Sequence, residues 1–216
     1  MKESLLQMKD AGDQLYRVTD SGWTEYAAFQ AYTQLMNLIA QRFPAAAPRP
    51  LSDFEVQTVE TIGGDLPFYR ELDRALLRET IQVYKPKFDL NIGNSGDNQT
   101  KISDIQKYVS AQDYRFNTVV DAADDIVTAG ERTLIMNGRD SSAYPNAIIY
   151  RDQSSVPIID WLAERFNTSM LAKCDDYAVN LSNTVQYKAE GRNAVDYIVV
   201  FVSESSLEAA FSSALS

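Results

Sequence analysis

The feature that most constrains the fold is a set of three apolar segments in the second half of the chain. An amphipathic segment separates the first two of them. The apolar segments lie at 146–152, 168–174 and 195–204, and the amphipathic segment at 155–166 lies between the first two. Apolar runs that alternate with helices are typical of parallel strands covered on both faces. The sequence therefore predicts a three-layer α/β domain in which helices flank a mostly parallel sheet.

The first half of the chain predicts helices and more exposed strands. Residues 4–14 have the pattern of a short amphipathic helix, and 15–18 has that of a strand. A second helix is expected to begin near Thr24, capped by Asp20 or Ser21. Its apolar residues recur at spacings of three and four, which predicts one buried face. They are Ala28, Ala31, Tyr32, Leu35, Leu38 and Ile39.

Further strands are expected at 54–59, at 81–92 with a break at Pro86, and at 132–138. The proline-rich stretch 44–50 ends the second helix, because proline cannot continue one. This stretch is a connector and not a convincing domain linker. We therefore expect one domain over residues 1–216.

The charge balance excludes several classes of partner. The chain has 20 basic and 30 acidic residues and a net charge of −10. A nucleic-acid backbone would be repelled by such a surface, so we expect no nucleic-acid partner. No apolar run approaches the roughly 20 residues needed to span a bilayer, and the start lacks the apolar core of a signal peptide. We expect no membrane span.

The chain contains no histidine and a single cysteine, Cys174. It therefore offers no Ser-His-Asp or Cys-His pair and no metal site built from His or several Cys ligands. The remaining chemistry is that of carboxylates, Lys, Tyr and Ser. We expect no cofactor and no metal.

Polar residues follow three of the expected strands, at 19–22, 151–155 and 203–206. In open α/β sheets, ligands bind outside the carboxyl ends of the strands, which makes these segments candidate site residues. Ser and Asp at such positions also cap the helix that follows. The residues alone leave both interpretations open.

The segment LYRVTDSGWTEYAAFQAYTQLMNLI resembles the Asp-x-His-Trp block of the alginate O-acetyltransferase-like, DHHW-type branch of the SGNH hydrolase superfamily. Asp20, Trp23, Ala28 and the Ala31-Tyr32 pair match that block. The segment 146–166 resembles the family's second block, 196–207 resembles its closing strand, and 63–69 resembles a Gly-Asp-Leu stretch between the blocks. The order and spacing agree over nearly the whole chain.

The resemblance implies an SGNH-like sheet and, in intact members, acyl transfer on polysaccharides. It assigns the nucleophile to the Ser of Asp-Ser-Phe and the base to the His of Asp-x-His-Trp, which the preceding Asp orients. In this chain the base position is Gly22 and the nucleophile position is Gln153, whereas Asp20 and Asp152 remain. The resemblance also implies that Gly22 and Gln153 face one cleft. The short segment before Asp20 leads us to expect the C-terminal part of the family fold, without its N-terminal strands.

These departures predict a catalytically degenerate protein that binds carbohydrate, or supports a partner protein in polysaccharide acylation, in the cell envelope. Residual O-acetyltransferase or acetylesterase activity that uses Asp20, Asp152 and Ser154 stays open as an alternative. A second alternative is an interaction module that pairs through an exposed sheet edge, and homo-oligomers are left open. A cytoplasmic location is not excluded by the sequence. The binding residues that we expect are Trp23, Arg151, Ser155 and Glu204.

Overall fold

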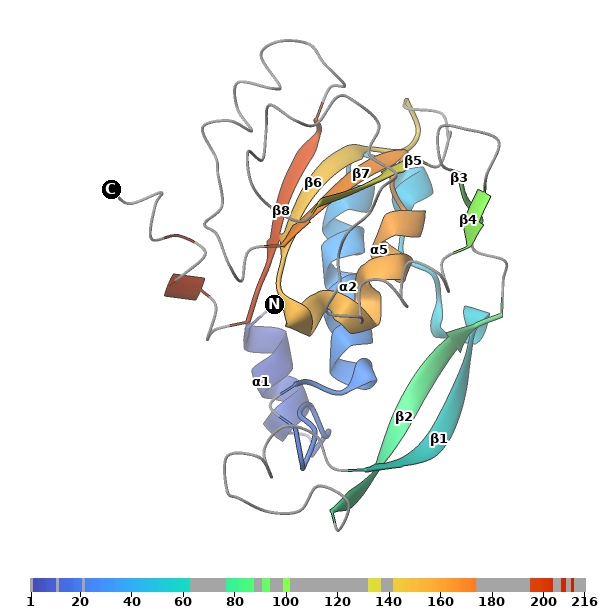
Figure 1. Cartoon of the computed structure of the whole chain (residues 1–216). Coiled ribbons are helices and arrows are strands. Elements are labelled where there is room, and N and C mark those ends of the chain that lie inside the picture. The colour runs from blue at the N-terminus through green and yellow to red at the C-terminus, as the bar shows by residue number, and fades with distance from the viewer. Residues whose placement is uncertain are drawn as a thin grey trace. The chain divides into compact units, whose positions relative to one another are not determined.

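The apolar strands of the second half form a four-stranded sheet in the computed structural model (Figure 1). Its strands are β5 (Arg132–Met136), β6 (Asn146–Arg151), β7 (Thr168–Lys173) and β8 (Tyr197–Phe201), in the order β5-β7-β6-β8. β6 pairs in parallel with both β7 and β8, and β5 pairs antiparallel with β7. The predicted α/β class with a mostly parallel sheet is confirmed.

The structure describes residues 2–10, 12–20, 22–62, 77–87, 91–93, 99–101, 132–136, 142–173, 195–203, 207–208 and 211. The chain divides into two compact units, and each is described by itself. The first unit comprises Met1–Leu38 and Pro48–Asp89, and the second comprises Ile39–Ala47 and Leu90–Ser216. The expectation of a single domain over 1–216 stays a prediction.

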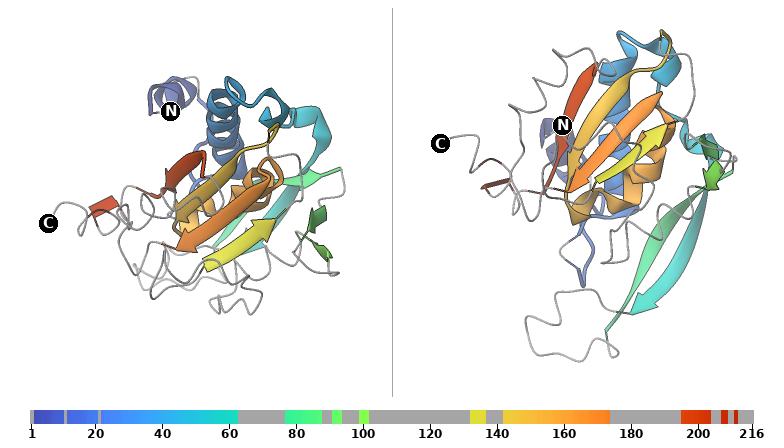
Figure 2. Two further views of the ribbon diagram at one scale, coloured as in Figure 1. Left: turned by 90° about the horizontal axis from the view of Figure 1, so that it is seen from above. Right: turned by 45° about the horizontal axis from the view of Figure 1, so that its top comes forward.

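Strand β6 lies in the interior of the sheet in the second unit, between β7 and β8 (Figure 2). Its residues Ala147, Ile148, Ile149 and Tyr150 are all buried. The Ile-rich run is thus covered on both faces, as its composition predicts. This burial fixes the carboxyl end of β6, where the polar residues from Asp152 onward begin.

The connection from β6 to β7 differs from the single helix expected at 155–166. A 3-10 helix, Gln153–Ile158, comes first, and the α-helix α5 covers only Ile159–Glu164. Pro157 lies inside the 3-10 segment and has no N–H to donate, so a regular α-helical turn cannot run through it. Ile159, Leu162 and Phe166 are fully buried, so this short connection still contributes to the core.

The first unit contains the helix α1 (Lys2–Asp10) and all but the last two residues of the helix α2 (Glu25–Ala40). The expected cap of α2 by Asp20 was wrong: the Thr24 hydroxyl accepts a hydrogen bond from the Ala27 N–H at 3.2 Å, and the other expected cap, Ser21, lies outside the described residues. A threonine directly before the first helical residue is well placed to satisfy one of the donors at that end. Asp20 is thereby left for other contacts.

The buried face of α2 is largely as predicted. Ala28, Ala31, Tyr32 and Ile39 are at most 1% exposed. Leu38 is the error, since it is 61% exposed while Met36 is fully buried. Met36 lies four residues after Tyr32 and therefore shares its face of the helix. Leu38 lies two residues after Met36, which is a rotation of about 200° around the helix axis, so it points to the opposite side.

The strands β1 (Phe54–Ile62) and β2 (Arg78–Pro86) form an antiparallel ribbon in the first unit. The half-exposed strand expected at 54–59 is confirmed and continues to Ile62, but its pairing with β2 was not predicted. The segment 15–18 is not a strand: it forms one antiparallel bridge, between Tyr16 and Trp23.

Short 3-10 helices lie at Pro44–Ala46 and Leu51–Asp53. A small hairpin of the second unit joins β3 (Asn91–Gly93) to β4 (Gln99–Lys101).

Phe29 of α2 forms the aromatic centre of the first unit. Its ring centroid lies 5.3 Å from that of Phe54 and 5.6 Å from that of Tyr84, which come from β1 and β2, and 5.9 Å from that of Tyr32. These separations are in the range of favourable aromatic pairs. The β1–β2 ribbon is therefore attached to α2 by ring packing at its Phe54 end.

We predict that Phe29→Ala destabilises the first unit by about 3–5 kcal/mol, because it removes the ring that both strands of the ribbon contact. Leu38→Ala, on the same helix but exposed, is the matched control and should change the unfolding free energy by less than about 0.5 kcal/mol. Urea unfolding followed by circular dichroism measures both. Equal effects of the two substitutions would contradict this account of the core.

Candidate functional site

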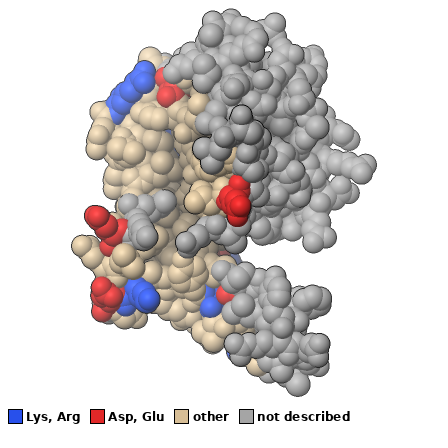
Figure 3. Space-filling view, turned by 90° about the vertical axis from the view of Figure 1, so that its left-hand side faces the viewer, with Lys and Arg blue, Asp and Glu red and all other residues tan. Residues whose placement is uncertain are grey.

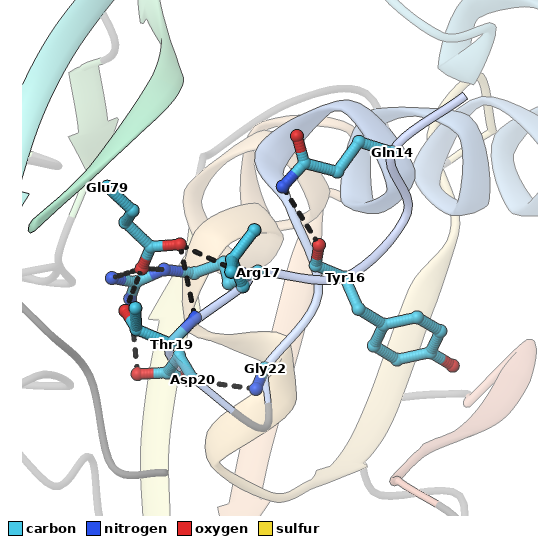
Figure 4. Close-up of polar contacts among 8 residues, drawn as sticks. Gln14, Tyr16, Arg17, Thr19, Asp20, Gly22 and Glu79 are labelled. Atoms are coloured by element: carbon cyan, nitrogen blue, oxygen red, sulfur yellow. Dashed lines mark hydrogen bonds and ion pairs between the residues drawn. The ribbon is translucent and has the colours of Figure 1, made fainter. Parts of the chain in front are cut away.

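A buried carboxylate organises the turn that resembles the Asp-x-His-Trp block. Glu79 of β2 is 8% exposed. Its carboxylate accepts hydrogen bonds from the Val18 N–H at 2.9 Å and the Thr19 hydroxyl at 2.7 Å, and it forms an ion pair with the Arg17 guanidinium (Figure 4). We call these four residues the Glu79 cluster. The cluster ties the strand to the start of the turn.

Asp20 continues this network at the next position. Its Oδ1 accepts a hydrogen bond from the Gly22 N–H at 2.8 Å, and its Oδ2 lies 3.2 Å from Arg17 Nη1. An Asp side chain that caps the amide two residues later closes an Asx turn. A Cβ added at Gly22 would lie 2.9 Å from Asp20 Oδ1. Any side chain at position 22 would therefore have to displace the carboxylate that the family resemblance assigns to orienting a base.

The pKa values of two carboxyl groups at β2, those of Glu79 and Glu25, are shifted in opposite directions. Burial acts to raise the pKa of Glu79, but hydrogen bonds from Thr19, Arg17 and Val18 and the charge of Arg17 outweigh it and hold the pKa below its ordinary value. Burial raises the pKa of Glu25, against the effect of the Tyr84 N–H that donates to it at 2.6 Å. The environment of Glu79 therefore stabilises its charged form. In that form the carboxylate holds the Arg17–Thr19 segment by hydrogen bonds and has no proton to donate.

The second unit carries a polar cluster at the carboxyl ends of two strands. Asp152, directly after β6, is 2% exposed. Its Oδ1 accepts hydrogen bonds from both the N–H and the hydroxyl of Ser154, and its Oδ2 accepts from the N–H and the hydroxyl of Ser203, each at 2.6 Å. Ser203 lies just beyond β8, so one carboxylate joins the ends of β6 and β8. We call these three residues the Asp152 cluster.

Three of the predicted binding residues, Arg151, Ser155 and Trp23, lie within the described residues, and two of them are buried. Arg151 is 2% exposed, and Ser155 is fully buried, with its hydroxyl donating to the Asp152 carbonyl at 2.8 Å. Trp23 is half-buried. Gln153 begins the 3-10 helix, although only its backbone is described, and Glu204 lies outside the described residues. The predicted roles of these residues remain predictions.

Asp152 and Ser154 are in direct contact, as an active pair would require. Asp20 and Gly22 are likewise in contact with each other. The first pair belongs to the second unit and the second pair to the first unit, so the expected cleft between Gly22 and Gln153 stays a prediction.

The charges of the described surface form no extended field on the face shown in Figure 3, where acidic and basic side chains lie in small groups among uncharged ones. Within the described ranges, no three side chains of His, Cys, Asp or Glu are grouped so as to hold a metal ion. In the same part of the chain, no helix has the length and apolarity required to cross a bilayer. The chemistry of both clusters is that of carboxylates with hydroxyl, amide and guanidinium donors.

Sequence reasoning missed Glu79 and Arg17, although a signal for Glu79 was present. Glu79, Ile81 and Val83 alternate along β2 with the exposed residues Arg78, Thr80 and Gln82. A carboxylate on the more covered face of a strand needs a buried partner. Ser203 lay in one of the polar strand ends that the sequence marked, but its bond to Asp152 depends on the neighbouring positions of β6 and β8.

Comparison with known proteins gives neighbours by structure and none by sequence. No family model matches the chain, and no curated protein matches it. Among solved structures, PatB1 of Bacillus cereus has a TM-score of 0.55 at 19% identity, over 91% of this chain and 64% of that one. The same protein with a sulfonyl adduct has a TM-score of 0.52 at 17% identity, over 89% and 60%.

A DHHW family protein from Eubacterium siraeum is similar at a TM-score of 0.52 and 14% identity, over 93% of this chain and 62% of that one. The chain thus spans between 60% and 64% of the length of these structures. At such low identity the likeness is one of fold. The resemblance to the DHHW-type branch is confirmed at that level, and the SGNH-like α/β fold expected from the sequence is confirmed with it.

We predict that Glu79→Gln destabilises the first unit by about 2–3 kcal/mol at pH 7, because it removes the charge that Arg17 and the turn amides bind. The depressed pKa of Glu79 makes this stabilisation fully present above the ordinary value of 4.5, and it is lost as the pH falls through the lower folded value. The difference between wild type and Glu79→Gln should therefore shrink below about pH 4.

Glu60→Gln is the matched control for this prediction. Glu60 lies on the same ribbon and pairs with Arg78 at 2.9 Å, but both side chains are exposed. An exposed pair contributes about 0–1 kcal/mol. Urea titrations between pH 3 and 8 compare the two variants, and a pH-independent effect of Glu79→Gln would contradict the assignment.

We predict that Asp152→Asn costs about 2–3 kcal/mol, because one carboxylate oxygen, an acceptor, would become an amide NH₂, a donor that faces the N–H and hydroxyl donors of a serine. Ser154→Ala removes one hydroxyl donor and should cost about 1 kcal/mol. Thermal unfolding and amide hydrogen exchange at β6 and β8 measure the effects. Unchanged protection of both strands in Asp152→Asn would show that Asp152 does not join them.

Proposed function

We propose that this chain is a catalytically degenerate SGNH-like protein that binds carbohydrate, or supports polysaccharide acylation by a partner, without transferring acyl groups itself. The proposal includes a location in the cell envelope, which follows from the family resemblance. It rests on the fold and on the residues at the two positions where the family carries its base and its nucleophile. Those are Gly22 and Gln153, in a chain without histidine.

The state of Asp152 is the observation that carries the proposal. An ionised carboxylate has about four lone-pair positions, and four donors from Ser154 and Ser203 approach those of Asp152. A carboxylate engaged in this way holds two strand ends together. It is poorly placed to accept a further proton from a nucleophile, which is what acyl transfer by a serine requires.

The same contact also favours a second candidate function, residual acetyl transfer or acetylester hydrolysis. The Ser154 hydroxyl already donates to Asp152, and Ser154 is only half-buried. In this alternative, Ser154 Oγ would attack the acetyl carbonyl while Asp152 accepted its proton, the ester C–O bond would break, and the leaving alcohol would take that proton; water or an acceptor hydroxyl would then remove the acetyl group from Ser154. Without an imidazole, the expected rate is several powers of ten below that of an intact triad, by analogy with triad deletions.

The test is a pair of measurements on the full chain. We expect binding to at least one oligosaccharide by glycan array and calorimetry, together with hydrolysis of p-nitrophenyl acetate no faster than that of a heat-unfolded sample. Absence of binding to any glycan and to a polysaccharide-acylating partner would contradict the proposal.

Ester hydrolysis above background would support the alternative only if Ser154→Ala abolished it. Ser52→Ala is the matched control, because Ser52 is an exposed serine of the first unit. Retention of hydrolysis in both variants would exclude Ser154 as the nucleophile, as a contaminating esterase would produce, and loss in both would show that the effect is not specific to Ser154. Either result would leave the enzymatic alternative without its proposed residue.

A further inference from the structure

The segment from Leu15 to Thr19 alternates between inward and outward side chains. Leu15 and Thr19 are buried and Arg17 contacts Glu79, whereas Tyr16 is 64% exposed and Val18 is 71% exposed. These two are the most exposed of the large apolar side chains that the structure describes. Both side chains are therefore directed to solvent, whereas the Arg17 guanidinium between them binds Glu79.

Trp23 lies on the same face as Tyr16. The two residues form an antiparallel bridge that is flanked by hydrogen bonds from the Arg17 N–H to the Gly22 carbonyl, at 3.1 Å, and from the Thr24 N–H to the Leu15 carbonyl, at 2.9 Å. This pattern makes Tyr16 and Trp23 a non-hydrogen-bonded pair, whose side chains lie side by side on one face. We call Tyr16 and Trp23 the Tyr16 face.

The backbone beneath this face is held from the opposite side. Glu79 binds the Val18 N–H and the side chains of Arg17 and Thr19, and the Gln14 amide donates to the Tyr16 carbonyl at 3.2 Å. Figure 4 shows the Tyr16 ring pointing away from Glu79. Tyr16 is thus an exposed ring on a fixed backbone, so that ordering this backbone adds little to the cost of binding.

We propose that the Tyr16 face is a stacking platform for the ring of a neutral sugar. The apolar C–H face of a sugar ring matches an aromatic surface whose edge is polar, as the Tyr hydroxyl makes it. Arg17, the cation nearest in sequence, is paired with Glu79 and Asp20. The charge of this guanidinium is thus already engaged by two carboxylates, which disfavours its use by an anionic ligand.

The charge of the chain points to the same ligand class. At a net charge of −10, the protein repels uronates and phosphates at a distance, so a neutral glycan binds at a lower electrostatic cost. This inference deepens the proposed function and rests on its carbohydrate-binding part. It adds the residues that make the contact and the charge class of the sugar.

The experiment measures binding of neutral hexasaccharides of glucose, mannose and N-acetylglucosamine, with an oligouronate of equal length as the anionic probe. Tyr16→Ala removes the ring and should weaken the affinity for the best-bound neutral saccharide by about 5- to 20-fold. Tyr16→Phe, which keeps the ring, should stay within about twofold of wild type. Leu51→Ala, at a side chain that is 49% exposed, is the matched control and should bind as wild type does.

Tryptophan fluorescence gives a second readout that does not depend on titrated affinity. The chain has two tryptophans, and Trp161 is 2% exposed, so acrylamide quenching mainly reports Trp23. A neutral sugar at the Tyr16 face should protect this fluorescence from acrylamide, and Trp23→Phe should remove the protected component. This variant also checks that Trp161 stays buried.

The outcomes separate the two proposals. Sugar binding that is unchanged in Tyr16→Ala overturns the Tyr16 face and leaves the proposed carbohydrate binding intact. Preference for the oligouronate overturns the neutral-sugar assignment. If no saccharide binds wild type, the carbohydrate half of the proposed function fails together with this inference, and a Tyr16-dependent change in sedimentation would then identify a protein interface instead.

Discussion

A carboxylate that is removed from water must find donors for its lone pairs, and this requirement governs both polar clusters of the chain. Glu79 and Asp152 are almost fully buried, and each binds donors from segments that are distant in sequence. Burying such a group without these partners would cost several kcal/mol. The turn at 17–22 and the junction of β6 with β8 are therefore defined by where their donors must lie.

The sequence was sufficient to predict the elements whose burial is continuous. The Ile-rich run of β6 and the three-four spacing of α2 each identify their element without knowledge of neighbours, because the pattern itself records which faces are covered. The resemblance to the DHHW-type branch added the order of the blocks. Leu38 shows the limit of this reasoning, since an apolar residue at the margin of a helical face is assigned by its neighbours and not by its type.

Contacts between distant segments could not be predicted in the same way. The pairing of β1 with β2, the binding of Thr19 by Glu79, and that of Ser203 by Asp152 each join residues at least 50 positions apart or depend on strand register. A polar residue in a strand pattern signals that a partner exists but not which residue it is. The candidate site could thus be placed at the strand ends from sequence, whereas its network required the structure.

The turn at Asp20 gives Gly22 a structural role that is independent of any catalytic one. An orienting carboxylate needs a free oxygen to accept an imidazole N–H. Asp20 instead uses Oδ1 for the Gly22 amide and Oδ2 for Arg17, and Arg17 is in turn held by Glu79. A Cβ at position 22 would lie 2.9 Å from Oδ1, so the Asp20 carboxylate would have to shift to admit a side chain there. The glycine and the carboxylate therefore stabilise each other in a conformation that serves the turn, and the same anchoring fixes the outward positions of Tyr16 and Val18.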